Sequence, residues 1–389
     1  MTSLLGRRIH IAGCIGSDDN SAPTEQVQAA REFVAELVKA LLKEGATFVV
    51  PVDGEPLRKS DGLPLTFDWL VLETIRDHHQ KLRPREAARD PRPLVIAVQH
   101  HKNNNQIPDD KCAVWDDLFD VDGLVYIENA GSWNIASKRM DLQGQQGDVL
   151  ITLGGDEGVL YLANLYRDAG KPVVPLNFEI VPSYQGSRKL FDTALISSQT
   201  HRFFRMVDGG NPHAAINRIH FRRAQPAQKR VEEMMGVIKA LRKPTAFAVR
   251  LLNPKVEAYK EVDDYFEAVV QPVVEELGYE LVTMNGEHAE FPFINQEIFE
   301  HLHRSSAVVV DVTGERPNCF IELGYALGRG SRVMVTAKEG TALPFDTEAV
   351  PTRMWDNEKS VAQKKAEFRA YWEANAQRRR IVEADPLVP

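Results

Sequence analysis

The sequence predicts an α/β protein made of two doubly wound parallel sheets. Short apolar runs of strand length alternate with stretches of helical periodicity along the chain, which is typical of parallel sheets covered by helices. At 389 residues the chain is too long for one ordinary domain and fits two. The alternation restarts after Lys243-Pro244, so we expect one domain over 1–242 and a second over 243–389.

In the first domain the order of elements predicts a Rossmann-like sheet. The helical stretch over 24–44 places Phe33, Leu37 and Leu41 on one face and ends at Gly45. Further helices are expected over 67–83, from the glycine-rich stretch at 154–158 to Asp168, and over 228–241. The expected strands are 8–12, 47–50, 94–98, 123–127, 149–153 and 172–176.

The second domain repeats the alternation, and we expect a five-stranded, flavodoxin-like sheet. Strands are expected over 245–251, 280–284, 306–310 and 332–336. Helices are expected over 265–277, over 295–303, from Glu322 onward, and over 359–380. In the last of these, Val361, Phe368 and Trp372 share one side.

Composition excludes several classes of function. The net charge of −8 disfavours a nucleic-acid partner, since such proteins usually carry a basic face. No apolar run approaches 18 residues, so we expect a cytoplasmic protein without a membrane partner. The three cysteines form no CxxC pair, and the adjacent pairs His78-His79 and His100-His101 cannot both reach one metal ion. We therefore expect no metal site.

The stretch SSAVVVDVTGERPNCFIELGYALGRG over 305–330 carries the strongest chemical signal. A buried strand ends in Asp311, where open α/β sheets place ligand groups. Glu322 follows eleven residues later, close to the expected start of a helix. Two carboxylates at one crevice suit chemistry on a sugar carbon that gains positive charge.

This stretch resembles the nucleoside 2-deoxyribosyltransferase-like family, which is similar in fold to TIR domains. The resemblance covers about 245–350. It implies that Asp311 orients the sugar and that Glu322 is the nucleophile or the stabiliser of the sugar cation. It also implies a substrate-binding role for Asn318. Arg250 and Asn253 follow the first strand of this domain and would face the base or a phosphate. The run over 251–254 (LLNP) departs from the family's PF, which leaves the base specificity open.

Two glycine loops in the first domain predict a phosphate or pyrophosphate site. The first loop, 13–17, and the second, 154–158, each follow a strand. The second also opens a helix, whose N-terminus favours negative charge. A third loop, 129–132, also follows a strand. The residues expected to bind the ligand are Gly13, Cys14, Gly154, Gly155, Asp156 and Glu157.

The first domain resembles the SLOG family, related to the LOG phosphoribohydrolases, in IHIAGCIG, DVLITLGGDEGVLYLANLYRDAGKPVVPL and GSRKLFDTAL. The match spans about 8–240. The LOG signature PGGxGTxxE is altered: Leu153 replaces its proline and Leu162 its glutamate. The resemblance therefore implies a sensor of a cyclic ADP-ribose-type nucleotide, with Arg188, Lys189 and Arg202 on its phosphates.

Together the two resemblances imply a signal-activated hydrolase that cleaves NAD⁺ to nicotinamide and ADP-ribose in antiphage defence. NAD⁺ would be the substrate, so no cofactor is expected, and TIR-like enzymes imply a homo-oligomer. Two alternatives stay open: a nucleoside deoxyribosyltransferase or N-glycosidase of nucleotide metabolism, and a non-catalytic nucleotide-binding protein. Structural interpretations also stay open: tight turns for the glycines, surface ion pairs for the basic residues, a helix-start carboxylate for Glu322 and a turn former for Asp311.

Overall fold

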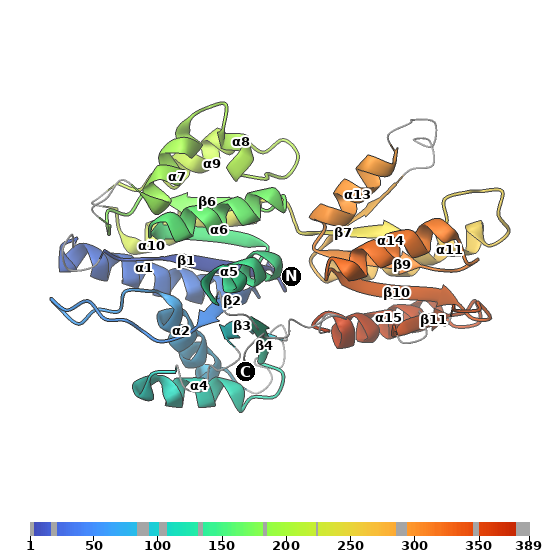
Figure 1. Ribbon diagram of the computed structural model, residues 1–389, viewed down its shortest axis with the longest axis horizontal. Helices are drawn as coiled ribbons and strands as arrows, with labels where there is room; N and C mark the ends of the chain where they lie inside the picture. The colour runs from blue at the N-terminus through green and yellow to red at the C-terminus, as the bar shows by residue number, and fades with distance from the viewer. Residues whose placement is uncertain are drawn as a thin grey trace. The chain divides into compact units, whose positions relative to one another are not determined.

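The computed structural model describes residues 4–16, 22–83, 93–100, 107–130, 135–181, 185–222, 225–284, 294–344 and 350–378. These residues divide into two compact units on either side of the Arg242–Lys243 peptide bond. Each unit is an α/β structure with a single, wholly parallel sheet (Figure 1). The predicted fold class is therefore confirmed.

The sheet of the first unit has six strands in the order β4-β3-β2-β1-β5-β6. Every strand predicted for this half is present, and β4 begins two residues later than predicted. The strands are β1 (Arg8–Cys14), β2 (Thr47–Val52), β3 (Val95–His100), β4 (Val125–Ala130), β5 (Val149–Gly154) and β6 (Val173–Leu176).

Helices cover both faces of this sheet because alternate strand residues point to opposite sides. Ile151 joins the large core beneath α1, α2 and α10, whereas Leu150 packs with Leu162 and Tyr166 of α6 on the other face. The helices are α1 (Thr24–Lys43), α2 (Asp68–Lys81), the 3₁₀ turn η3 (Asp109–Lys111), α4 (Cys112–Phe119), α5 (Ile135–Gln146), α6 (Glu157–Asp168), α7 (Gly186–Leu195), α8 (Thr200–Phe203), α9 (Pro212–Arg218) and α10 (Ala227–Ala240).

The sheet of the second unit has the order β11-β10-β9-β7-β8, which is the flavodoxin-like order. The predicted count of five is confirmed, and the strand that the sequence did not locate is β11. Its TRMW sequence is short and half polar, so it lacks the apolar run of a buried strand. The strands are β7 (Thr245–Val249), β8 (Glu280–Thr283), β9 (Ala307–Asp311), β10 (Arg332–Lys338) and β11 (Thr352–Trp355).

The helices of this unit pack around two cores, one on each face of the sheet. The predicted helix over 265–277 begins earlier and passes through one π-helical turn. In the last helix Phe368 and Trp372 are buried as expected, but Val361 at its first position is 45% exposed. The helices are α11 (Tyr259–Tyr265), the π-helix η4 (Phe266–Val270), α12 (Gln271–Glu276), α13 (Ile294–Arg304), α14 (Pro317–Gly328) and α15 (Val361–Asn375).

The helix predicted to start at Glu322 begins five residues earlier, at Pro317. Proline suits the first helical position because its fixed φ matches the helix and the missing N–H would be unpaired there. Glu322 is therefore in the second turn of α14, and Asn318 is at its start. Among the described helices, none combines the length and apolar character needed to cross a bilayer.

Candidate functional sites at the strand ends

The crevice of the first sheet lies between the carboxyl ends of β1 and β5. The chain fills one side of β1 with β2, β3 and β4, then returns to its other side with β5, so these two neighbours mark the switch point where such folds bind ligands. Their register pairs Gly13 with Leu153 and Cys14 with Gly154. The structure thus brings the two predicted glycine loops together.

The glycines at this crevice allow backbone segments to approach each other closely. A Cβ on Gly13 would lie 1.8 Å from the carbonyl oxygen of Leu153, and one on Gly154 would lie 2.4 Å from that of Cys14. The N–H of Gly155 donates to the same Cys14 carbonyl at 2.9 Å and so is already paired. These contacts support the structural interpretation of the glycines as tight turns.

The N-terminus of α6 presents carboxylates to the crevice. The Asp156 side chain caps the helix by accepting a hydrogen bond from the N–H of Gly158 at 3.0 Å, and Glu157 is the first helical residue. Two negative charges already occupy the positive end of the helix dipole and oppose a phosphate there.

Two further acidic residues lie at the same sheet edge and are not among those predicted from the sequence. Asp53 directly follows β2 and pairs with Arg139 of α5, and Asp68 begins α2. Burial raises the pKa of Asp68 to about 7. Burial also raises the pKa of Cys14 to about 11, and the carboxylates of Asp156 and Asp68 add to that rise. The strand-end position of Asp53 is the signal that identifies this edge in the sequence.

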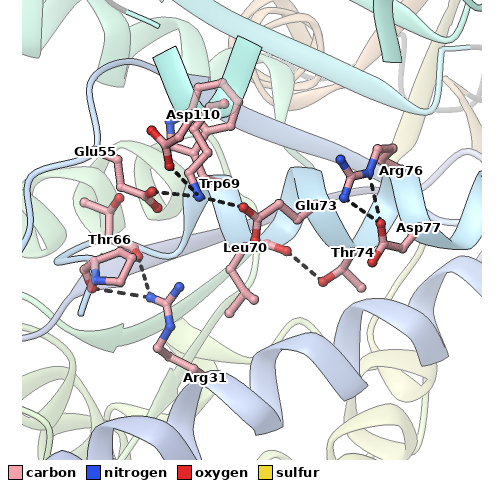
Figure 2. A network of polar contacts seen from close by, with 12 residues as sticks. Arg31, Glu55, Thr66, Trp69, Leu70, Glu73, Thr74, Arg76, Asp77 and Asp110 are labelled. Atoms are coloured by element: carbon pink, nitrogen blue, oxygen red, sulfur yellow. Dashed lines mark hydrogen bonds and ion pairs between the residues drawn. The ribbon is translucent and has the colours of Figure 1, made fainter. Parts of the chain in front are cut away.

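Internal polar contacts fix the start of α2 beside this crevice (Figure 2). The Arg31 guanidinium of α1 donates to the backbone carbonyls of Pro64, at 3.3 Å, and Thr66, at 3.1 Å. The Lys111 ammonium lies 3.0 Å from Glu55 and 2.6 Å from Glu73. Contacts to Pro64 and Thr66 before α2, and to Glu73 within it, therefore hold the segment around Asp68.

The basic residues predicted to bind phosphates do not gather at one place. Arg188 and Lys189 are in the first turn of α7, at whose start a Cβ on Gly186 would lie 2.2 Å from the carbonyl oxygen of Gly155. Arg202 instead lines a cavity with Arg167, near the far end of α6. Ten residues of helix separate Arg167 from Glu157, about 15 Å. Arg202 is thus at the opposite edge of the sheet from the glycine loops.

The third predicted loop follows β4, which is separated from β1 by β2 and β3. Asn129 is near the end of β4, and its side-chain oxygen accepts a hydrogen bond from Gln99 at 3.1 Å. The rest of this loop, 131–132, lies outside the described residues.

In the second unit the switch point lies between β7 and β9. Arg250 directly follows β7, Asp311 ends β9, and α14 follows a short loop after β9. Because carboxyl ends of parallel strands meet at one edge of a sheet, the predicted residues of this unit all belong to the same edge.

Asp311 is closed to solvent, with an exposed fraction of 1%. Its carboxylate accepts hydrogen bonds from the backbone N–H of Thr313 at 3.0 Å, the Thr336 hydroxyl at 2.7 Å and the Trp355 indole N–H at 3.0 Å. Burial raises its pKa, and the three donors oppose that rise. The side chain joins β9, β10 and β11, so in this structure it positions the strand ends rather than facing a ligand.

Glu322 is half-buried, and its carboxylate makes no hydrogen bond or ion pair with another described residue. Burial raises its pKa to about 7. One helical turn earlier, burial raises the pKa of the Cys319 thiol to about 12, and the carboxylates of Glu322 and Asp311 both contribute. Asp311 and Glu322 therefore both lie near the Cys319 thiol. Asp311 is buried and hydrogen-bonded, whereas Glu322 makes no hydrogen bond with another described residue.

The other three residues predicted at this edge, Arg250, Asn253 and Asn318, differ in their side-chain contacts. Arg250 pairs with Asp263 and lies over the Phe266 ring, 5.4 Å from its centroid. The Asn253 side-chain oxygen accepts from the backbone N–H of Lys255 at 3.0 Å, which closes a local turn. Asn318 is exposed at the start of α14.

Two curated relatives match part of the chain. Both are ATP nucleosidase Cap17, one from Escherichia coli strain KTE188 and one from Escherichia coli, each 26% identical over 182 residues. The match covers 46% of this chain and 34% of each relative, so it spans about a third of the relatives' own length.

Two solved structures were also found to be similar. One is a structural-genomics X-ray structure, 16% identical, with 59% of this chain and 99% of that chain covered and a TM-score of 0.31. The other is DNA processing protein A from Helicobacter pylori, 18% identical, with 51% and 79% covered and a TM-score of 0.31. Scores this low carry no weight for fold or function.

A family model, described as ATP nucleosidase Cap17-like, N-terminal, matches residues 4–238. This match covers more than half of the chain and contains the whole crevice between β1 and β5, while the second unit lies outside it. The chain therefore belongs to the Cap17-like family defined by that N-terminal domain.

Proposed function

We propose that this protein is a nucleotide N-glycosidase that hydrolyses the bond between ribose and base. The observation that carries the proposal is Glu322, an unpaired, half-buried carboxyl with a pKa of about 7 at the switch-point edge of the second sheet. Cleavage of this bond leaves a ribosyl cation, and an adjacent carboxylate stabilises that cation or attacks it. The name of the curated relatives, ATP nucleosidase, belongs to the same reaction class.

In the proposed reaction the bond between the sugar carbon and the base nitrogen breaks, and its electron pair leaves with the base. Ionised Glu322 stabilises the positive sugar carbon until water adds to it and releases a proton. Asp311 is a positioning residue, because its contacts to Thr336 and Trp355 fix the end of β9 from which the loop to α14 departs.

NAD⁺ and ATP are the two candidate substrates. The nicotinamide of NAD⁺ is cationic before cleavage and leaves as a neutral molecule, so its departure needs no proton donor. The relatives' name favours ATP, whose adenine requires a proton to leave easily. In antiphage defence the first unit would sense a cyclic ADP-ribose-type signal, and the active protein would be a homo-oligomer.

The test is to incubate the full chain with NAD⁺ or ATP, with and without cyclic ADP-ribose isomers, and to measure released nicotinamide or adenine by chromatography. Glu322→Gln keeps the shape but removes the charge, and we expect base release to fall by about 100-fold or more. Glu300→Gln, an exposed change on α13, is the matched control and should leave the rate unchanged. Full activity in Glu322→Gln would show that the assignment is wrong.

The same assay separates hydrolysis from transfer. A deoxyribosyltransferase would use Glu322 in the same way but pass the sugar to a second base. Adding a free base to a deoxynucleoside would then yield a new nucleoside and no loss of NAD⁺ or ATP.

A further inference from the structure

The first unit also contains a cavity that is separate from the crevices at the strand ends. Its volume is about 400 Å³, and its described lining consists of Arg167, His201, Arg202 and Arg205. The lining comes from the end of α6 and from α8 with the residues after it. A concave site lined by three arginines and a histidine is suited to an anion.

The cavity lies at the amino edge of the sheet. Arg167 is in the last turn of α6, and the adjoining hollow includes Val173, the first residue of β6. The glycine loops and the acidic cap of α6 are at the other end of that helix. A ligand here would therefore not be repelled at close range by Asp156 and Glu157.

A second hollow of about 190 Å³ adjoins the first, because Arg167 and Arg202 line both. Its described lining combines apolar and polar side chains. The apolar residues are Ala163, Val173, Leu190 and Phe203, and the polar ones are Asn164, Thr193 and Gln199. An apolar pocket with a few polar groups beside a cationic cavity is the usual form of a site for a phosphorylated heterocycle.

Arg202 and Arg167 are oriented by weak contacts that leave most of their charge available. Arg202 donates to the Gln199 side-chain oxygen at 3.0 Å, which is a neutral partner. Arg167 pairs with Asp168 at 3.4 Å, and both side chains are about half exposed or more, so this pair contributes little. Guanidinium groups bind phosphate through two parallel hydrogen bonds, which a lysine cannot do.

We propose that these joined hollows bind a nucleoside phosphate, with its phosphates on Arg167 and Arg202 and its heterocycle against Leu190 and Phe203. The site is separate from both strand-end crevices and does not depend on the proposed reaction. It would allow the first unit to bind a nucleotide while the second unit acts on another.

The test is calorimetric titration of the full chain carrying Glu322→Gln, so that the titrant is not consumed. ATP, tripolyphosphate and adenosine are the probes. Arg202→Gln should weaken one ATP binding event at least tenfold, and any ATP bound at the second unit should remain. Lys239→Gln on α10 removes one exposed positive charge elsewhere and should change nothing.

A second variant tests the apolar hollow. Thr193→Phe fills it from α7 and should reduce ATP affinity to that of tripolyphosphate, while tripolyphosphate binding is unchanged. An ATP isotherm identical in the Arg202→Gln and parent chains would overturn the site, as would a single-stranded oligonucleotide that binds more tightly than ATP. Absence of base release by the wild-type chain, with this ATP binding intact, would contradict only the proposed reaction.

Discussion

The Glu322 carboxyl must be ionised to stabilise a positive sugar carbon, and its pKa is about 7 because of burial. The ionised fraction therefore rises with pH, so we expect kcat/KM for base release to increase up to about pH 7 and then level off. The measurement is a pH profile of nicotinamide or adenine release. A rate that falls above pH 7 would instead mean that the protonated form acts, as a general acid.

A second buried residue gives a prediction about stability. His10 is 1% exposed, and its Nδ1 lies 3.1 Å from the Tyr166 hydroxyl. That hydroxyl donates to the Gln143 carbonyl at 3.0 Å, so the histidine must be the donor of the first bond. Burial lowers the pKa of His10 to about 3, below its unfolded value near 6.5.

Because the unfolded chain binds this proton more readily, the contribution of neutral His10 to stability is complete above about pH 6.5 and is lost as the pH falls toward 3. Relative to His10→Phe, the free energy of unfolding of the wild type should fall by up to about 1.4 kcal/mol per pH unit over that window. Urea titrations at several pH values measure this, with the exposed His220→Phe as control. Parallel curves for wild type and His10→Phe would contradict the burial argument.

At the scale of elements, the junction of β5 and α7 depends on Gly186. Its φ is +58°, and a Cβ there would lie 2.2 Å from the Gly155 carbonyl oxygen. We expect Gly186→Ala to destabilise the protein by about 3 kcal/mol or more, because both backbone strain and overlap oppose it. Gly209 has a φ of +80° with nothing within 4 Å, so Gly209→Ala should cost only about 1 kcal/mol. Equal losses in urea unfolding would show that the close contact is unimportant.

The alternation of strands and helices was predictable because each apolar run is buried on a parallel sheet and each amphipathic helix covers it. The glycine loops could be found for the same reason, since the turn after a strand restricts residue type. The short, half-polar β11 gives no such signal. The sequence prediction starts α14 too late, at Glu322, because it does not use Pro317, although proline is favoured at a first helical position.

The placement of side chains in space was the least predictable part. Arg188, Lys189 and Arg202 lie within fifteen positions of one another, yet α7 carries the chain from one edge of the sheet toward the other. Asp311 has the right strand-end position for a ligand group, but its three donors come from β10, β11 and the following turn, which pattern alone cannot pair with it.

For the whole molecule, each unit has buried cores of its own among the described residues. Each unit therefore has the apolar packing that independent folding requires. We expect residues 1–242 produced alone to unfold cooperatively in urea. A shorter piece, 1–226, lacks α10 with its buried Met234 and Ile238 and should not fold, since losing several such side chains exceeds a typical net stability.

The fragment 1–242 also tests which unit carries out the proposed reaction. If Glu322 is the reacting carboxylate, folded 1–242 should bind ATP at the arginine cavity and release no base from NAD⁺ or ATP, whereas the full chain does. Base release by 1–242 alone would move the reaction to the crevice between β1 and β5. Asp68 would then be the first residue to replace, because burial raises its pKa to about 7, as it does for Glu322. If Glu322 reacts, 1–242 releases no base; if the crevice with Asp68 reacts, 1–242 releases base. The assay of this fragment therefore identifies the active unit.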